Sequence, residues 1–381
     1  MTSSASARRT LTGLLGILSA NVVEGRYAGA QQLAMTPPAP IRVAVARMTH
    51  GHVSRIWAAQ RLDIQIVGIF EPNAELVERL APRFGFARRI VYTDLARMLD
   101  ASKPDAVVAF GSIREHLAVV EAAAPRGIHV MVEKPLAVSV EHALRIRALA
   151  QRYGIHVLTN YETSWYPSML AAHQILKGDS VIGVLRKLVV HDGHPGPKEI
   201  GVGPEFLEWL TDPAQNGGGA LFDFGCYGAN LATWFMNGKT PLTVTAVTQQ
   251  IKPDVYPRVD DEATIVLTYP SAQAIIQASW NWPVSRKDIE LYGKTGYVIA
   301  PNATSLRLRR KQDAPEESFT LETGMPPAED EFQFLVGVVR GTIRVSETDL
   351  ASLTNNVTVV RILEAARQSA RNGRTVRLES R

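Results

Sequence analysis

Apolar and polar positions in the first half of the chain follow a pattern that predicts parallel strands separated by helices. Short apolar runs have the length of buried strands, and the segments between them carry apolar residues at helical spacing. The expected strands are 41–45, 64–69, 106–109, 130–132 and 156–158, and the expected helices are 53–58, 74–84, 115–124 and 140–153. This alternation predicts an α/β fold, a Rossmann doubly wound parallel sheet with its ligand crevice at the carboxyl ends of the strands.

The pattern changes after about residue 160, where expected strands alternate polar and apolar residues. Such alternation is typical of antiparallel strands with one face exposed or paired. The expected strands are 185–191, 244–250, 262–269, 274–280, 288–292 and 297–300, and the expected helices are 329–340 and 349–371. We therefore expect a Rossmann domain at 41–159 and a C-terminal α/β domain at 160–381 with a large, mostly antiparallel open sheet. The exposed sheet face also predicts a homo-dimer or homo-tetramer.

The composition fits two soluble globular domains, because 46% of the 381 residues are hydrophobic and 20% are charged. The net charge is +4 and no basic tract stands out, so we expect neither nucleic-acid binding nor stable membrane association. Cys226 is the only cysteine, which excludes an intrachain disulfide.

Residues 1–40 read as a signal peptide and linker rather than as part of the fold. Two arginines at 8–9 precede an apolar run at 11–23, and small residues follow at 28–30. This order is typical of a twin-arginine-like secretory signal and predicts a periplasmic protein. The alternative is a cytoplasmic protein whose synthesis starts at Met35.

The first loop of the Rossmann domain is the expected binding site for the phosphates of a dinucleotide. The fingerprint Gly-x-Gly-x-x-Gly is reduced here to a segment that begins at Ala46 and keeps only the last glycine, Gly51. A helix N-terminus can still bind phosphate, and Thr49 and His50 could add hydrogen-bond donors. Ordinary loop chemistry explains the two polar residues equally well.

Glu71 ends the second expected strand, 20 residues after Gly51, where an acidic side chain can bind ribose hydroxyls. A carboxylate there repels a 2′-phosphate, so the sequence favours NAD. Arg47 lies nearby and could accommodate that phosphate, which leaves NADP open. The alternative reading of Glu71 is a polar turn.

Two segments carry candidate catalytic residues. Lys134 ends an expected strand at the predicted crevice, and Asp223 and Tyr227 are four residues apart, which would place them on one helix face. A nearby ammonium would lower the tyrosine pKa from about 10, so that Tyr227 could take a hydroxyl proton while hydride leaves. Asp223 could orient the lysine or a substrate hydroxyl. The structural alternatives are a buried aromatic for Tyr227 and a helix N-cap for Asp223.

These segments resemble the Gfo/Idh/MocA family, which includes glucose–fructose oxidoreductase and inositol 2-dehydrogenase. The resemblance covers about 41–381 and rests on Glu133-Lys134-Pro135, on His116, and on Gly217-Gly-Gly followed by Asp223-x-Gly225-x-Tyr227. It implies a cofactor contact for His116 and Glu133, a nicotinamide and substrate contact for Lys134, and substrate binding by Asp223, Tyr227 and Asn230. Tyrosine at 227 with asparagine at 230 is similar to the glucose–fructose oxidoreductase branch.

His194, on a loop after an expected strand, is a further candidate for substrate binding, although a lone loop histidine is more often structural. His50 and His52 have no evident ligand partner, and no cluster has metal-ligand spacing, so we expect no metal.

Three functions remain open. The first is an NAD(P)-dependent dehydrogenase of a sugar or polyol. The second is a redox-neutral sugar-converting enzyme with tightly bound NAD. The third is a non-catalytic nucleotide- or sugar-binding regulator, which the degraded glycine motif favours and the retention of Lys134 and Tyr227 opposes.

Overall fold

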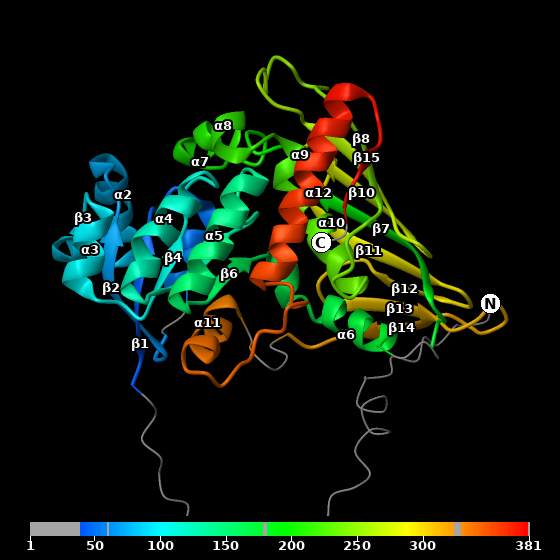
Figure 1. Ribbon diagram of the computed structural model, residues 1–381, viewed down its shortest axis with the longest axis horizontal. Coiled ribbons are helices and arrows are strands. Elements are labelled where there is room, and N and C mark those ends of the chain that lie inside the picture. The colour runs from blue at the N-terminus through cyan, green and yellow to red at the C-terminus, as the bar shows by residue number, and fades with distance from the viewer. Residues whose placement is uncertain (1–38, 59–60, 178–180, 324–327, 329, 380–381) are drawn as a thin grey trace, which may run out of the picture.

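The computed structural model describes residues 39–58, 61–177, 181–323, 328 and 330–379, and two β-sheets organise it (Figure 1). The N-terminal sheet has six strands in the order β3-β2-β1-β4-β5-β6, all parallel. Their bounds are β1 Ile41–Ala46, β2 Ile64–Phe70, β3 Val91–Tyr92, β4 Ala106–Ala109, β5 His129–Glu133 and β6 Val157–Asn160. This strand order is that of the doubly wound dinucleotide fold, so the first prediction is confirmed.

Helices cover both faces of this sheet, and apolar clusters fill the space on each side. They are α2 Ala74–Phe84, α3 Leu95–Ser102, α4 Glu115–Ala123 and α5 Val140–Tyr153, with short 3-10 turns η2 Arg88–Ile90 and η3 Ala124–Arg126. Side-chain caps begin α2 at Asn73 and α5 at Ser139, and left-handed glycines end both helices. The element after β1 is a 3-10 helix, η1 Gly51–Trp57, where we expected an ordinary helix.

The second sheet has nine strands in the order β14-β13-β12-β11-β7-β10-β9-β8-β15. Their bounds are β7 Leu185–Gly193, β8 Thr243–Gln249, β9 Glu262–Thr268, β10 Gln273–Ser279, β11 Arg286–Gly293, β12 Tyr297–Ala300, β13 Ser305–Arg309, β14 Glu317–Thr320 and β15 Val376–Arg377. All its neighbours pair antiparallel except β10 and β7. The expected open, mostly antiparallel sheet is therefore confirmed, with three strands added at its ends.

The helices of the C-terminal region place the site and join the two halves. They are η4 Glu162–Trp165, α6 Pro167–Leu176, α7 Pro204–Leu210, α8 Pro213–Asn216, α9 Ala220–Asp223, α10 Gly225–Phe235, α11 Glu331–Val339 and α12 Leu353–Asn372. Phe332 and Leu335 of α11, and Val357 and Val360 of α12, join the apolar clusters of the Rossmann domain. The chain therefore returns to the first domain after building the second sheet, and α12 lies between the two sheets in Figure 1.

None of the helices within the described ranges is long and apolar enough to cross a membrane. The expected signal peptide falls in residues 1–38, outside the described part of the chain.

Candidate active site

A cavity of about 850 Å³ lies between the two domains, at the carboxyl ends of β1 and β5. Its walls come from the loop after β1, from α2, from Lys134, and from the segment 200–210 with α9 and α10. Among the residues that the sequence predicted, seven line this cavity: Thr49, His50, Gly51, Lys134, His194, Asp223 and Tyr227. The cavity is therefore in the crevice that the fold class predicts.

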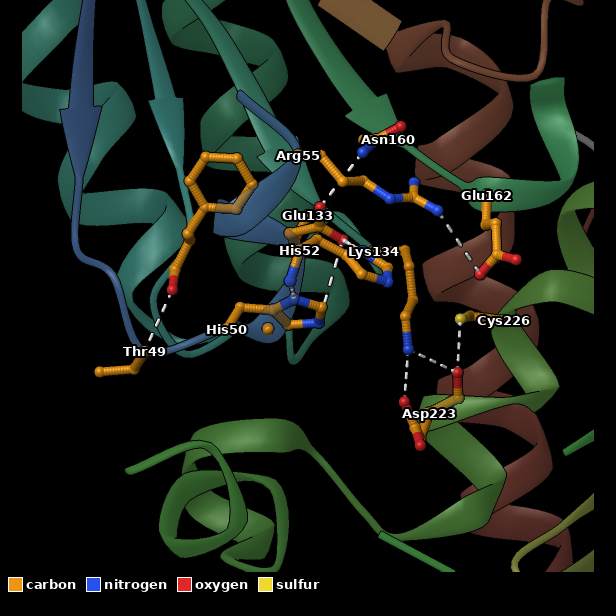
Figure 2. Close-up of polar contacts among 12 residues, drawn as sticks. Thr49, His50, His52, Arg55, Glu133, Lys134, Asn160, Glu162, Asp223 and Cys226 are labelled. Carbon is orange, nitrogen blue, oxygen red and sulfur yellow. Dashed lines mark hydrogen bonds and ion pairs between the residues drawn. The ribbon is translucent and has the colours of Figure 1, made fainter. Parts of the chain in front are cut away.

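Two residues of the cavity wall, Lys134 and Asp223, form a buried ion pair (Figure 2). The Lys134 Nζ donates to the Asp223 carboxylate and, at 3.0 Å, to the Asp223 carbonyl. The other Asp223 carboxylate oxygen accepts from the Trp280 indole at 2.9 Å. Burial opposes both charges, but their attraction holds the pKa of Lys134 above and that of Asp223 below its usual value. Asp223 thus orients a lysine that stays charged, one of its two expected roles.

The glycine-rich segment before Asp223 explains how the chain turns there. A Cβ atom at Gly219 would lie 1.8 Å from the Asp260 carbonyl oxygen, so only glycine fits this approach. The Asp260 carboxylate then accepts from the backbone N–H groups of Gly219 and Leu221 at 2.9 and 2.7 Å. Helix α9 ends at Asp223 and α10 begins at Gly225. Asp223 and Tyr227 therefore occupy two helices, and the expectation that they share one helix face is wrong.

Tyr227 is almost fully buried in α10, at 1% exposure, and packs edge-to-face on Tyr161. Two ammonium groups contact its ring rather than its hydroxyl: Lys134 Nζ at 5.1 Å and Lys287 Nζ at 5.2 Å from the ring centre. Burial, followed by the charge of Glu162, raises the Tyr227 pKa well above its usual value. The prediction that Lys134 lowers this pKa is therefore wrong. At neutral pH the phenol therefore keeps its proton and does not act as a base.

His194 follows β7 and contacts the Phe224 ring edge-on. Its Nδ1 accepts from the Gly196 backbone N–H at 3.0 Å, which places the proton of the neutral ring on Nε2. Burial lowers the His194 pKa, so the neutral form prevails. His194 therefore offers the cavity an N–H donor.

A second polar cluster lies where η1 meets the end of β5. The Glu133 carboxylate accepts from Asn160 Nδ2 at 3.1 Å, and its other oxygen lies 3.2 Å from His52 Nδ1 and 4.0 Å from His50 Nε2. Burial opposes this charge, but the imidazoles and Lys134 hold the pKa of Glu133 well below its usual value. Glu133 is itself buried and does not line the cavity, so it braces the cavity wall rather than presenting its carboxylate to a cofactor as expected.

These three residues could also hold a metal ion, since one ligand atom from each lies within 4.8 Å of the others. Sequence spacing hid this group, because Glu133 is 81 residues from His52. However, the His50 Nδ1 already accepts from the His52 backbone N–H at 3.1 Å, so the ring proton is on Nε2, which faces Glu133. That tautomer favours hydrogen bonding over metal ligation, and the expected absence of a metal stays a prediction.

Glu71 does not present its carboxylate to a ribose. Its side chain is fully buried, and its oxygens bind Arg47 Nη1 at 2.6 Å and the backbone N–H groups of Met48 and Asn73 at 2.9 and 3.0 Å. The Arg47 Nε also lies 3.0 Å from the Glu115 carboxylate. The ribose contact predicted for Glu71 is therefore wrong for this arrangement, in which the carboxylate braces the loop after β1.

Three other expected contacts also fail to reach the cavity. His116 is fully buried, with Nδ1 3.2 Å from the Leu136 carbonyl. Asn230 is fully buried and donates to the Leu350 carbonyl at 2.9 Å, which ties α10 to the segment before α12. Ala46 is fully buried at the end of β1. These side chains face the core, so the predicted ligand contacts of His116 and Asn230 are corrected to structural roles.

The loop after β1 still fits a dinucleotide. Gly51 has open space where a side chain would be, and the Met48 side chain packs into the apolar core of the domain. The cavity volume is within the usual range for ligand pockets. Sequence reasoning gave no role to His52, Glu162 and Lys287, which also line the cavity; Lys287 pairs with Glu162 at 2.7 Å.

This fold and site define the class of the protein: a two-domain oxidoreductase with an NAD-binding Rossmann domain. The chain belongs to the Gfo/Idh/MocA family, since residues 44–161 match the model of the oxidoreductase family with an NAD-binding Rossmann fold and residues 169–299 match the Gfo/Idh/MocA C-terminal domain.

Named relatives and solved structures are similar over most of the chain. D-apiose dehydrogenase of Paraburkholderia graminis is 24% identical over 333 residues, which cover 83% of this chain and 84% of that protein. D-xylose 1-dehydrogenase (NADP(+)) 2 of Haloferax volcanii is 24% identical over 69% of this chain and 77% of its own length. Aldose-aldose oxidoreductase from Caulobacter crescentus, solved with glycerol, has a TM-score of 0.73 at 22% identity and covers 89% of this chain and 100% of its own. An inositol dehydrogenase homologue from Azotobacter vinelandii, solved with NAD+, has a TM-score of 0.75 at 19% identity, over 90% of this chain and 98% of its own.

Proposed function

We propose that this protein transfers hydride between a hydroxyl-bearing carbon of a sugar or polyol and NAD or NADP. The buried Lys134–Asp223 pair carries the proposal, because it fixes an ammonium in the wall of a cavity that the cofactor loop also lines. A bound nicotinamide supplies the hydride acceptor or donor. Residues 49–51 of the loop would hold its phosphates. The dehydrogenases of D-apiose and D-xylose among the relatives support a sugar or polyol substrate.

The charged and polar groups of the cavity suit the oxygen of such a substrate. Lys134 donates to the reacting oxygen and stabilises negative charge on it, and Asp223 keeps the ammonium in place. Tyr227 and His194 offer further hydrogen-bond donors, since burial keeps the phenol protonated and the imidazole neutral. In the direction of carbonyl reduction, these donors polarise the carbonyl and stabilise the negative charge that develops on its oxygen.

A redox-neutral reaction with retained cofactor is the second candidate. Helix α7 covers the cofactor loop: Trp209 Nε1 donates to Thr49 Oγ1 at 3.1 Å, and the Phe206 ring lies 4.5 Å from the His50 ring. A covered loop favours slow release of a bound nucleotide. The likeness to an aldose-aldose oxidoreductase is in keeping with this candidate.

We further propose a homo-dimer or homo-tetramer formed on the open face of the second sheet, and periplasmic export by the twin-arginine-like leader. Sizing with light scattering tests the first proposal, and cell fractionation of the full chain tests the second.

The proposed activity is tested in two stages. Nucleotide released from purified protein is identified, and the stripped protein is titrated with NAD and NADP by calorimetry; a panel of aldoses and polyols is then assayed for NAD(P)H formation. Lys134→Met should abolish turnover, whereas Lys311→Met, at an exposed position outside the cavity, should not change it. Binding of neither nucleotide, or full turnover by Lys134→Met, would overturn the proposal.

A further inference from the structure

Oxidation of a hydroxyl needs a group that accepts the hydroxyl proton, and three candidates in the cavity cannot do so at neutral pH. Lys134 is held as ammonium by Asp223, and burial keeps the Tyr227 phenol protonated. The His194 Nδ1 lone pair is already used by the Gly196 N–H. The Glu162 carboxylate, also in the cavity wall, already accepts from Lys287 and from the Tyr166 hydroxyl, so the remaining groups of the cavity are the candidates for the proton acceptor.

His52 has the required lone pair. An ionised carboxylate only accepts hydrogen bonds, so the 3.2 Å hydrogen bond between Glu133 and His52 Nδ1 places the imidazole proton on Nδ1. The Nε2 atom of the neutral ring is then unprotonated. It has no hydrogen-bond partner among the described residues and is not one of their enclosed polar atoms. The side chain is 24% exposed and lines the cavity that Lys134 and Tyr227 also line.

The surroundings of His52 hold this orientation. Asn160 fixes the opposite oxygen of the Glu133 carboxylate, and the His50 ring stands edge-on to the His52 ring with a centroid distance of 4.4 Å. The His52 backbone N–H is bonded to His50 Nδ1, which fixes the start of η1 (Figure 2). A histidine that is oriented through Nδ1 by a buried carboxylate, and whose Nε2 is free, has the arrangement of a general base.

We propose that His52 is the catalytic base of the hydroxyl oxidation and that Glu133 is its positioning residue; this inference rests on the proposed function. The substrate O–H bond breaks and its proton moves to His52 Nε2, while the carbon gives up its hydrogen with the electron pair to an oxidised nicotinamide and becomes a carbonyl. The groups in contact with His52 are Glu133, at the end of β5, and His50 from its own loop, and Lys134 follows Glu133 in the chain. The Glu133 carboxylate stabilises the imidazolium, and Lys134 stabilises the alkoxide.

Variants at His52 and Glu133 separate this role from a structural one. His52→Asn keeps an N–H group near the position of Nδ1 and removes Nε2. The variant should therefore fold like the wild type, and its dissociation constant for the nucleotide should stay within about threefold of the wild-type value. Turnover should fall by roughly 100- to 10,000-fold, the usual contribution of a general base. Glu133→Gln should weaken the tautomer preference and reduce turnover less. His156→Asn is the matched control, since His156 is exposed and outside the cavity.

The tautomer is measured without turnover, by ¹⁵N NMR of histidine-labelled protein, with His52 assigned from the variant. The expected spectrum has a proton on His52 Nδ1 and none on Nε2. A proton on Nε2, or turnover of His52→Asn within twofold of wild type, would overturn the inference. Zinc binding that shifts both His50 and His52 would also overturn it in favour of a metal site. Failure of wild-type protein to bind either nucleotide would instead refute the proposed function.

Discussion

Removal of the Asp223 carboxylate should destabilise the protein as well as inactivate it. The Lys134 and Asp223 side chains are 7% and 5% exposed, so Asp223→Ala leaves a buried ammonium without its counterion. The Trp280 indole loses its acceptor at the same time. Removing one partner of a buried ion pair usually lowers the free energy of unfolding by about 3–5 kcal/mol. Leaving a buried N–H group without an acceptor, here the Trp280 indole, usually costs about 1–3 kcal/mol.

The reverse substitution should cost less. In Lys134→Met, the Asp223 carboxyl group loses the charge that lowers its pKa, so it can take up a proton and keep its bond to Trp280. The double variant Lys134→Met with Asp223→Leu removes both charges, and it should be more stable than Asp223→Ala although equally inactive.

The assay is urea unfolding of the full chain at pH 7, with comparison of midpoints at unchanged slope. Nucleotide titration of each variant shows whether the loop after β1 remains intact. If Asp223→Ala unfolds within about 1 kcal/mol of wild type, the pair is hydrated in solution, and the argument for an ammonium fixed by burial fails.

Three further predictions concern protonation and the loop after β1. Titration of the wild type and of Tyr227→Phe, followed by ultraviolet absorption, gives the ionisation of Tyr227 as the difference between the two curves. Tyr227 should ionise at a higher pH than the exposed tyrosines, since burial raises its pKa. Ionisation at the same pH as the exposed tyrosines, or below it, would contradict this. Glu162 has its pKa lowered from 4.5 to about 2, with burial outweighed by Lys287. The Glu162–Lys287 ion pair stabilises the fold above the unfolded pKa of Glu162, and this stabilisation is lost as the pH falls from 4.5 towards 2. Glu162→Gln should therefore make the free energy of unfolding, measured with urea, less dependent on pH in this acid range. An unchanged pH dependence would argue against the Glu162–Lys287 pair. Arg47→Ala should leave Glu71 buried without its cation. Burial raises the Glu71 pKa above its usual value, and loss of the Arg47 charge raises it further, so the loss of stability should be larger at pH 7.5 than at pH 5. An equal loss at both pH values would show that Glu71 is already neutral in the wild type.

Much of the fold was predictable from the sequence, because buried parallel strands and amphipathic helices have distinct apolar periods. The helices 74–84 and 140–153 coincide with α2 and α5. The edge strands β3, β14 and β15, and β13 next to β14, were missed, since they are only two, four, two and five residues long. The packing of α11 and α12 against the first domain was also not predicted, because contacts between segments so distant in the chain leave no local pattern in the sequence.

The candidate site was predictable where a motif fixes both a residue and its place in the fold. Lys134, Asp223 and Tyr227 do line one cavity. Their protonation was not predictable, because it depends on burial and on contacts between distant segments: the tyrosine pKa rises where a neighbouring lysine alone would lower it. The pairing of His52 with Glu133, 81 residues away, was hidden for the same reason.

The loop after β1 keeps a defined structure although the glycine motif is altered, because Glu71 now braces this loop. Arg47 adopts a left-handed backbone conformation with φ of 66°, which costs a residue other than glycine roughly 1–3 kcal/mol. Its guanidinium group binds both Glu71 and Glu115, and the Glu71 carboxylate also accepts the Met48 N–H. These charged contacts offset the backbone strain and hold the loop without the first two glycines. In this arrangement the Glu71 side chain is fully buried against the loop, so groups other than Glu71 are the candidates for discrimination between NAD and NADP.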